Sequence, residues 1–255
     1  MKNFVVVAIL GAVCVFPVVG FADTVSVAGS SVVYAVGGQA SLANSHMVQG
    51  TAPVVILLPK DGLDVTFSVV GSVSLDGGRT WGGPDGTTLR AATSVNTGYG
   101  SISGLTAPGE GFLAGVFVGA DGPLGSMPAD LDFTSTSFHS LNPEMDQTFF
   151  IGDGLNGSGA GVVQTFYIPA GATELVLGIS DAGQFNGAPS CYWDNLGGFT
   201  VTDTVVTPEP CSLALLATGL LGMMGMVRRR ALHSRFRVEE CMPVGCAADV
   251  GSGIE

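Results

Sequence analysis

Residues 63–75 read LDVTFSVVGSVSL, and this stretch indicates the class of fold. Polar residues separate most of its apolar side chains, which are Val65, Phe67, Val69, Val73 and Leu75. Alternation with a period of two places the apolar residues on one face of an extended strand. The stretch therefore predicts a β-strand with one buried face.

Similar stretches occur on both sides of it. We expect further strands at residues 25–35, 54–58, 112–118, 149–151, 163–168, 174–179 and 199–206. Turn residues separate these runs, and the pair Asp-Gly, which tolerates the positive φ of tight hairpins, occurs five times. Several short strands joined by turns predict an all-β fold, an antiparallel β-sandwich over residues 23–206.

The first 22 residues have the composition of a secretory signal peptide. Lys2 precedes an apolar core at residues 4–19, and the small residues Gly20 and Ala22 stand before the expected cut. An uncleaved N-terminal membrane anchor is the alternative interpretation. We expect export of the chain through the inner membrane.

A second membrane-directed segment, residues 207–230, reads TPEPCSLALLATGLLGMMGMVRRR. It begins with a stiff, non-helical element, because proline fixes φ and lacks an N–H; this element is Pro208, Glu209 and Pro210. The apolar run at residues 211–227 would span about 25 Å as a helix, which is at the short end for crossing a bilayer. The positive flank that keeps this end cytoplasmic is Arg228, Arg229 and Arg230.

This order of parts resembles the PEP-CTERM sorting signal of exopolysaccharide-producing Gram-negative bacteria. The resemblance implies processing by a membrane enzyme, an exosortase, near residues 208–210. It also implies transient anchoring by the transmembrane helix at residues 211–227, followed by release to the cell surface or to the extracellular matrix of a biofilm. An ordinary C-terminal membrane anchor is the alternative. Such signals usually end soon after the arginines, whereas this chain continues through residues 231–255, which we expect to be disordered.

The expected β-domain is strongly acidic. Residues 23–206 contain three basic and sixteen acidic residues, a formal charge of −13, within a chain of net charge −12. This balance excludes the electrostatic footprint of a nucleic-acid-binding domain. This negative charge could attract cations, or it could keep an exported protein soluble. Of five cysteines only Cys191 lies in the domain, so no internal disulfide is predicted.

No catalytic pattern is present in the expected domain. Its two histidines, His46 and His139, belong to no nucleophile or metal-binding motif. Asp130 and Asp132 are neighbouring carboxylates, but no spacing selects them as an acid–base pair. We therefore expect no enzyme, and a hydrolase of matrix polysaccharide is the weakest hypothesis.

Residues 175–201, reading LVLGISDAGQFNGAPSCYWDNLGGFTV, concentrate oxygen-bearing side chains. Asp181 ends an expected strand, and Asp194 and Asn195 precede the next one. Ca²⁺ takes about six to eight oxygen ligands from carboxylates, amides and backbone carbonyls. If the loop folds back, these side chains meet at one end of the domain, and calcium is the expected cofactor.

Three stretches resemble the PA-IL-like galactophilic lectins, small β-sandwiches whose calcium bridges protein and sugar hydroxyls: residues 69–86, 112–119 and 171–201. The resemblance implies calcium ligands at Asp181, Asp194 and Asn195, with a backbone carbonyl from Leu75 or Asp76. The loop between Asp181 and Asp194 is longer than in that family, and Asp194 stands where an Asn is usual. The longer loop affects the residues that would contact the sugar, whereas Asp194 would still coordinate calcium, with one more negative charge.

The loop also carries candidate ligand-binding residues. Tyr192 and Trp193 could form an aromatic platform for a sugar ring, with Asn186 as a polar contact; packing in the core or at its rim is the alternative for the aromatics. The leading hypothesis is calcium-dependent binding of exopolysaccharide or a galactoside glycan. The alternative is a structural matrix or surface protein with a ligand-free domain, in which Asp181, Asn186, Asp194 and Asn195 are turn and cap residues.

Overall fold

The computed structural model describes residues 18–36, 50–87, 94–123, 125–157, 159–208, 218–226 and 228. Pro17–Pro208 form one compact unit. The described residues of this unit contain thirteen strands and short 3₁₀ helices, and most strand pairs are antiparallel. The prediction of an all-β fold is confirmed.

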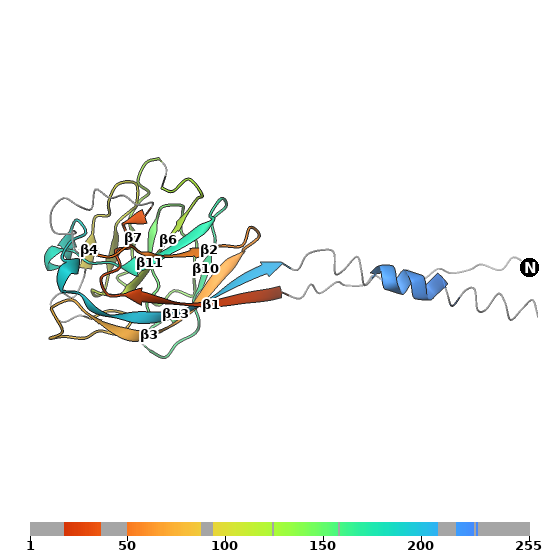
Figure 1. The fold of residues 1–255 in the computed structure, drawn as a ribbon, viewed down its shortest axis with the longest axis horizontal. Helices are drawn as coiled ribbons and strands as arrows, with labels where there is room; N and C mark the ends of the chain where they lie inside the picture. The colour runs from red at the N-terminus through yellow and green to blue at the C-terminus, as the bar shows by residue number, and fades with distance from the viewer. Residues whose placement is uncertain are drawn as a thin grey trace, which may run out of the picture. The chain divides into compact units, whose positions relative to one another are not determined.

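The first sheet has five strands in the order β1-β13-β3-β10-β8 (Figure 1). Their bounds are Val18–Ala28 (β1), Leu196–Pro208 (β13), Asp64–Ser74 (β3), Thr165–Tyr167 (β10) and Ser140–Leu141 (β8). The three long strands pair antiparallel over eleven residues each. In β3 the alternation read from the sequence is realised, because Val65, Phe67, Val69 and Val73 are buried.

The second sheet has four antiparallel strands in the order β2-β11-β6-β9. Their bounds are Val54–Leu57 (β2), Glu174–Ile179 (β11), Leu113–Val118 (β6) and Thr148–Phe150 (β9). Every residue of β6 is buried, as its apolar sequence predicts for a central strand.

The first two sheets share one apolar core. The ring centroids of Phe149 in β9 and Phe166 in β10 lie 5.2 Å apart and so join the two sheets. Phe166 also contacts Phe67 of β3 at 5.3 Å, and Phe149 contacts Phe117 of β6 at 5.1 Å. Aromatic burial of this kind is a large favourable term in folding.

A third, small sheet has the order β12-β4-β5-β7. Its strands are Asn186–Gly187 (β12), Ser94–Asn96 (β4), Leu105–Ala107 (β5) and Leu131–Asp132 (β7). None of these strands is expected from the sequence, because two or three residues are too few to show a period. The sheet matters for the site because β4 positions Asn96 beside the end of β11, as described below.

Both ends of the compact unit lie in one strand pair. The β1–β13 register runs from Val18 opposite Pro208 to Ala28 opposite Gly198. β1 therefore begins five residues before Asp23, inside the segment expected to be removed as a signal peptide. The register shows that these residues can extend the sheet; their removal stays a prediction.

Much of the expected sorting signal lies outside the described residues. Pro208 ends β13, and residues 218–226 and 228 are helical, whereas Glu209, Pro210, Arg229 and Arg230 are not described. No described helix is long and apolar enough to span a membrane.

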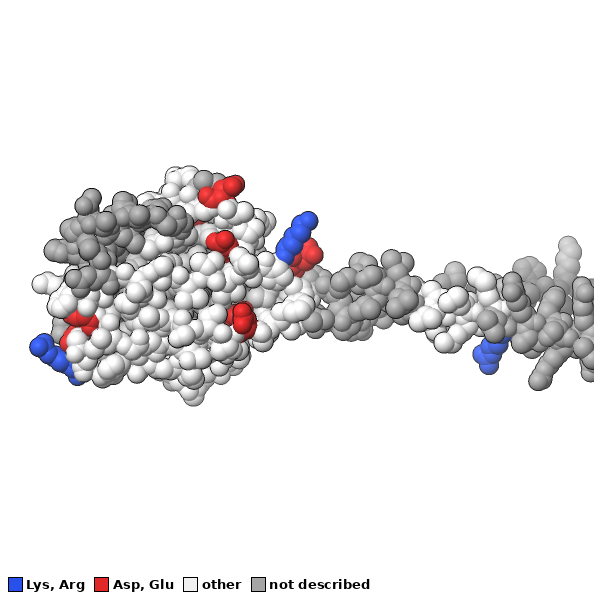
Figure 2. All heavy atoms as spheres, in the orientation of Figure 1, with Lys and Arg blue, Asp and Glu red and all other residues white. Residues whose placement is uncertain are grey.

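The described surface of the compact unit carries little positive charge. Its described basic residues are Lys60 and Arg79, and Figure 2 shows a mainly uncharged face with isolated acidic groups. The described surface therefore has the excess of acidic over basic residues that the sequence predicts for this domain.

Candidate functional site

Asp181 follows the last residues of β11 and is 2% exposed. Its backbone N–H donates to the Tyr192 hydroxyl at 3.1 Å, and that hydroxyl donates to the carbonyl of Ile179 at 2.9 Å. Its backbone carbonyl accepts a hydrogen bond from Asn96 Nδ2 at 3.0 Å. These bonds connect the backbone of Asp181 to the strand before it, to the loop after it and to the third sheet. The position from which its carboxylate extends is therefore fixed.

Asn195 provides the partner of the Asp181 carboxylate. Asn195 Nδ2 donates to Asp181 Oδ2 at 3.1 Å and to the carbonyl of Gly29 at 3.1 Å. These two bonds fix the orientation of the amide. Its Oδ1 is then buried without a hydrogen-bond partner, and Asn195 as a whole is 7% exposed. A buried acceptor without a donor costs about 1–3 kcal/mol, and an amide oxygen is a ligand that hard cations accept.

Asp194 connects the site to the turn after β3. Its backbone carbonyl accepts a hydrogen bond from the N–H of Gly77 at 3.0 Å. The carboxylate of Asp194 lies near enough to Asp181 to affect its ionisation. The structure thus brings together Asp181, Asp194, Asn195 and the turn that contains Asp76, the four positions predicted for calcium.

The electrostatic environment of Asp181 disfavours its charged form. The pKa of Asp181 is raised to about 7, mainly by burial and to a smaller extent by the negative charges of Asp194 and Glu110. The hydrogen bonds from Asn195 and from the backbone of Ala182 oppose this shift. Glu110 is itself almost completely buried. A cation at this position would stabilise the ionised carboxylate, since an opposite charge lowers the pKa of an acid.

The side chain of Asp76 caps its own turn, whereas the ligand expected from this turn is the backbone carbonyl of Leu75 or Asp76. Its Oδ1 accepts hydrogen bonds from Ser74 Oγ at 2.9 Å and from the backbone N–H groups of Arg79 at 2.9 Å and Thr80 at 2.8 Å. Burial alone would raise the pKa of Asp76, but these hydrogen bonds lower it to about 2. The Asp76 carboxylate therefore stabilises its own turn, and the calcium role of the Leu75 or Asp76 carbonyl stays a prediction.

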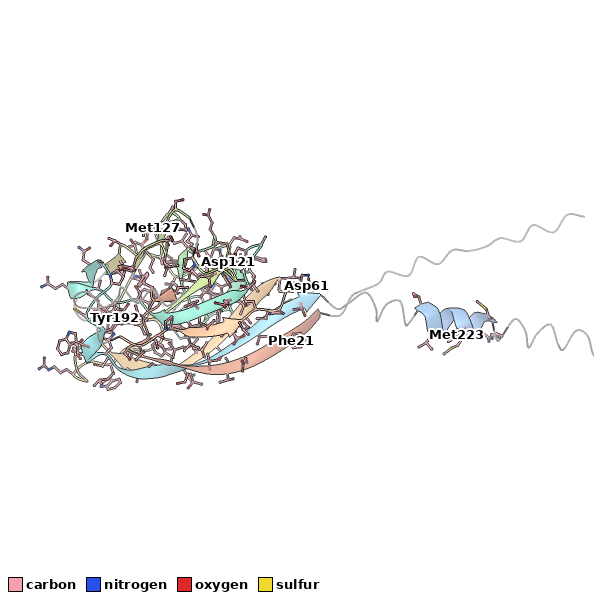
Figure 3. All side chains as sticks on the ribbon, turned by 45° about the horizontal axis from the view of Figure 1, so that its top comes forward. Phe21, Asp61, Asp121, Met127, Tyr192 and Met223 are labelled. Atoms are coloured by element: carbon pink, nitrogen blue, oxygen red, sulfur yellow. The ribbon has the colours of Figure 1, made fainter. Side chains whose placement is uncertain are left out.

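The two candidate aromatic residues differ in exposure. Tyr192 is 1% exposed and packs in the core cluster (Figure 3). Its ring is therefore closed to a sugar, and the core-packing alternative describes it. Trp193 is 62% exposed and stands beside Asp194. Trp81, half-exposed on the turn that bonds Asp194, donates from Nε1 to the carbonyl of Gly78 at 3.1 Å.

The loop between Asp181 and Asn195 contains unusual backbone. Gln184 has φ 54° and Cys191 has φ 69°, both in the left-handed region that residues other than glycine seldom adopt. Such conformations persist only where the surroundings enforce them and are found at binding sites. Asn186 lies in this loop with an exposed side chain, in strand β12 opposite Val95 of β4. Its place is therefore on the third sheet.

Two buried residues of the site are not identified from the sequence. Asn96 stands before a turn and accepts the N–H of Gly98 at Oδ1, as many turn asparagines do. Glu110 lies in a glycine-rich stretch, and the one available signal is a carboxylate next to the apolar run that follows. The long sequence separation from Asp181 gives no hint of contact for either residue.

The carboxylates of the described part of the chain do not form a metal-binding cluster of their own. No three His, Cys, Asp or Glu side chains there are grouped to hold a metal ion. Cation binding at Asp181 would therefore depend on Asn195 Oδ1 and backbone carbonyls as well as on carboxylates. Of the histidines, His46 lies outside the described residues, and His139 Nδ1 lies 3.2 Å from Asn156 Nδ2.

Comparisons with family models, with curated proteins and with solved structures found no match to this chain.

Proposed function

We propose that this chain is an exported surface or matrix protein, sorted by an exosortase, whose β-domain binds exopolysaccharide at the end of the domain that carries Asp181 and Trp193. The domain would be an antiparallel β-sandwich of the galactose-binding-like kind, and calcium would be its cofactor. Its partners would be the processing exosortase, the inner membrane before processing, and a galactoside-containing glycan.

The buried pair of Asp181 and Asn195 carries this proposal. It combines a carboxylate whose pKa is raised to about 7 with an amide oxygen that lacks a donor. A hard cation satisfies both groups at once, because it takes anionic and neutral oxygen ligands together. Asp194 and Glu110 add negative charge that attracts a cation to the same place.

The depth of the pair suggests what calcium would do. Asp181 and Asn195 are nearly inaccessible to solvent, so a cation held by them would lie under the loop of residues 182–194. Calcium would therefore fix the loop, and the exposed ring of Trp193 on that loop would contact the sugar. Exposed aromatic rings contribute apolar contact area at low conformational cost.

The structural alternative also has a supporting observation. The Asp76 carboxylate caps its own turn, and Tyr192 is a core residue. Tyr192, one of the two aromatic residues proposed for sugar contact, thus has a structural role. A ligand-free matrix or surface building block would need no more than this.

Calorimetric titration of the exported protein with a panel of galactosides, in Ca²⁺ and in chelator, separates the two functions. Trp193→Ala should reduce glycan affinity at least tenfold without lowering the melting temperature, because its ring is exposed. Tyr167→Ala, which removes an exposed aromatic ring on β10, is the matched control and should leave affinity unchanged. Absence of binding heat with every glycan would favour the structural function.

A further inference from the structure

The last residues of β13 depend on β1 for their pairing. β3 reaches along β13 only as far as the pair Asp64–Val206. Thr207 and Pro208 have register partners in β1 alone, at Val19 and Val18. On the β1 side, Thr204–Pro208 are paired throughout with Val18–Ala22. The last five residues of β13, which end on the first proline of the Pro-Glu-Pro element, are therefore covered by five residues near the start of the chain.

The described side chains of the covering segment, at residues 20–22, add little to the core. Phe21 is 60% exposed, and Gly20 and Ala22 are exposed as well. Figure 3 places Phe21 near the end of the long strand pair, away from Tyr192. Within the described side chains of β1, burial begins further along, at Val25 and Val27. Backbone pairing, more than side-chain burial, therefore attaches residues 20–22 to the domain.

These five residues are also the end of the expected signal peptide. Hydrolysis of the Ala22–Asp23 peptide bond consumes one water, leaves a carboxylate on Ala22 and an amine on Asp23, and removes the whole covering segment. β1 then starts at Asp23, opposite Asp203. The backbone of Thr204–Pro208 loses its partners on that side and becomes an open strand edge, a template for pairing with another chain.

We propose that the Val18–Ala22 segment masks a recognition edge at Thr204–Pro208, and that signal removal opens this edge to the peptidase that processes the C-terminal sorting signal. The inference rests on the proposed export and sorting. Extended peptides add to proteins as strands through main-chain hydrogen bonds, and the open edge of β13 leads directly into Pro208-Glu209-Pro210. Processing at the two ends thereby occurs in a fixed order, N-terminal first.

A second copy of the chain is a poorer occupant of the edge. The domain carries a formal charge of −13, and Asp23 and Asp203 lie opposite each other where the open edge begins. Two such edges would bring like charges together, which disfavours pairing between copies.

The test uses the full chain in a bacterial host that carries an exosortase, with C-terminal processing followed by pulse-chase and mass spectrometry. Ala22→Leu blocks signal cleavage because the position before the cut requires a small residue, while the exposed Ala22 site in β1 accepts a larger side chain. C-terminal processing should become at least tenfold slower in this variant.

A second pair of variants distinguishes masking from simple retention at the membrane. Adding Phe21→Pro to Ala22→Leu removes a backbone donor and disrupts the β1 pairing, so processing should return to near the wild-type rate. Adding Phe21→Ala preserves the backbone donor, so processing should stay slow.

Each outcome bears on a different claim. Equal processing of the wild type and Ala22→Leu would overturn the masking inference alone, as would a Phe21→Pro double variant that stays unprocessed. A mature protein that dimerises through residues 204–208 would overturn the choice of occupant. Absence of C-terminal processing in the wild type would overturn the proposed sorting and, with it, this inference.

Discussion

Asn195 holds the carboxylate of Asp181 through one hydrogen bond from Nδ2 to Oδ2, 3.1 Å long, between two buried residues that are fourteen positions apart in the chain. The bond closes the loop that carries Trp193. Asn195 Oδ1 stays buried without a donor, and burial raises the pKa of Asp181 to about 7 although the bond from Asn195 opposes this shift. The loop is thus closed by a pair that is incompletely satisfied without a cation.

The raised pKa of Asp181 predicts a dependence of stability on pH. In the unfolded chain an aspartate titrates near about 3.9, so between about pH 4 and pH 7 the folded state binds one more proton than the unfolded state. Without calcium, the free energy of unfolding should therefore fall as pH rises through this interval and then level off.

Replacing Asp181 by Asn should remove that slope. Asp181→Asn cannot ionise, so it should stabilise the calcium-free protein by several kcal/mol at pH 8 and have little effect near pH 4. Urea unfolding at the two pH values measures the difference. Asp121→Asn, at an exposed aspartate, is the control and should change stability little at either pH. Equal effects of Asp181→Asn at both pH values would contradict the account of this carboxylate.

Removing the Tyr192 hydroxyl should lower the stability of the protein by a measurable amount. Tyr192→Phe leaves the buried N–H of Asp181 without its partner, which should cost about 1–3 kcal/mol. The carbonyl of Ile179 loses its 2.9 Å bond and keeps only the longer one from the N–H of Val33, at 3.5 Å. Tyr167→Phe, which removes the hydroxyl of an exposed tyrosine, should change stability by less than about 0.5 kcal/mol. Denaturant unfolding at constant m-value tests both variants.

Gly197, at the start of β13, has too little space around it for a larger side chain. Its φ is 81°, and a Cβ there would meet the Trp81 ring at 2.6 Å and also the carbonyl oxygen of Ser72. Gly77 has a similar φ of 70° but open space around it. Gly77→Ala should therefore cost only the left-handed backbone term, about 1–2 kcal/mol, and Gly197→Ala should cost clearly more. Equal losses in thermal unfolding would show that the Trp81 contact does not constrain Gly197.

Replacing the buried Asp203 by Asn is a second substitution that we expect to stabilise the protein. Asp203 is buried on the inner face of β13, its Oδ1 lacks a hydrogen-bond partner, and its register partner in β1 is Asp23. Burial, followed by the charge of Asp23, raises the pKa of Asp203 above its usual value. The folded state therefore binds its proton more tightly, and this contribution to stability is lost as pH rises. Asp203→Asn should stabilise the protein more at pH 8 than at pH 4, in the same urea assay.

The long strands could be predicted from the sequence because the pattern of apolar and polar side chains along each strand shows which of its faces is buried. In β3 the alternation of Val65, Phe67 and Val69 with polar residues fixes one buried face, and in β6 a continuous apolar run indicates burial throughout. The two-to-three-residue strands could not be predicted. Strands such as β5 and β7 are too short for a period and depend on tertiary pairing.

The start of β1 shows a different limit. Residues 18–22 have the apolar and small side chains of a signal-peptide end, and the same residues also form a regular strand with β13. Composition alone cannot separate these two uses, because one segment can serve both at different stages of the protein's life.

The candidate site could be predicted in part. Asp181, Asp194 and Asn195 flank one loop, so a loop that folds back brings them together. The position of Asp76 before two glycines indicates the turn cap that its carboxylate forms, and the carbonyl of Leu75 or Asp76 stays a predicted ligand. Asn96 and Glu110 are distant in sequence, and only the three-dimensional arrangement brings them to Asp181.

Thermal unfolding of the exported protein, in millimolar Ca²⁺ and in chelator at neutral pH, tests the central claim most directly. A ligand that binds only the folded state adds RT ln(1 + [L]/Kd), about 2.7 kcal/mol at a hundredfold excess over Kd. This should raise the melting temperature of the wild type by several degrees, and Asp181→Asn should abolish or greatly reduce the shift. Identical melting of the wild type in Ca²⁺ and in chelator would contradict calcium binding at Asp181 and leave the ligand-free structural protein as the better account.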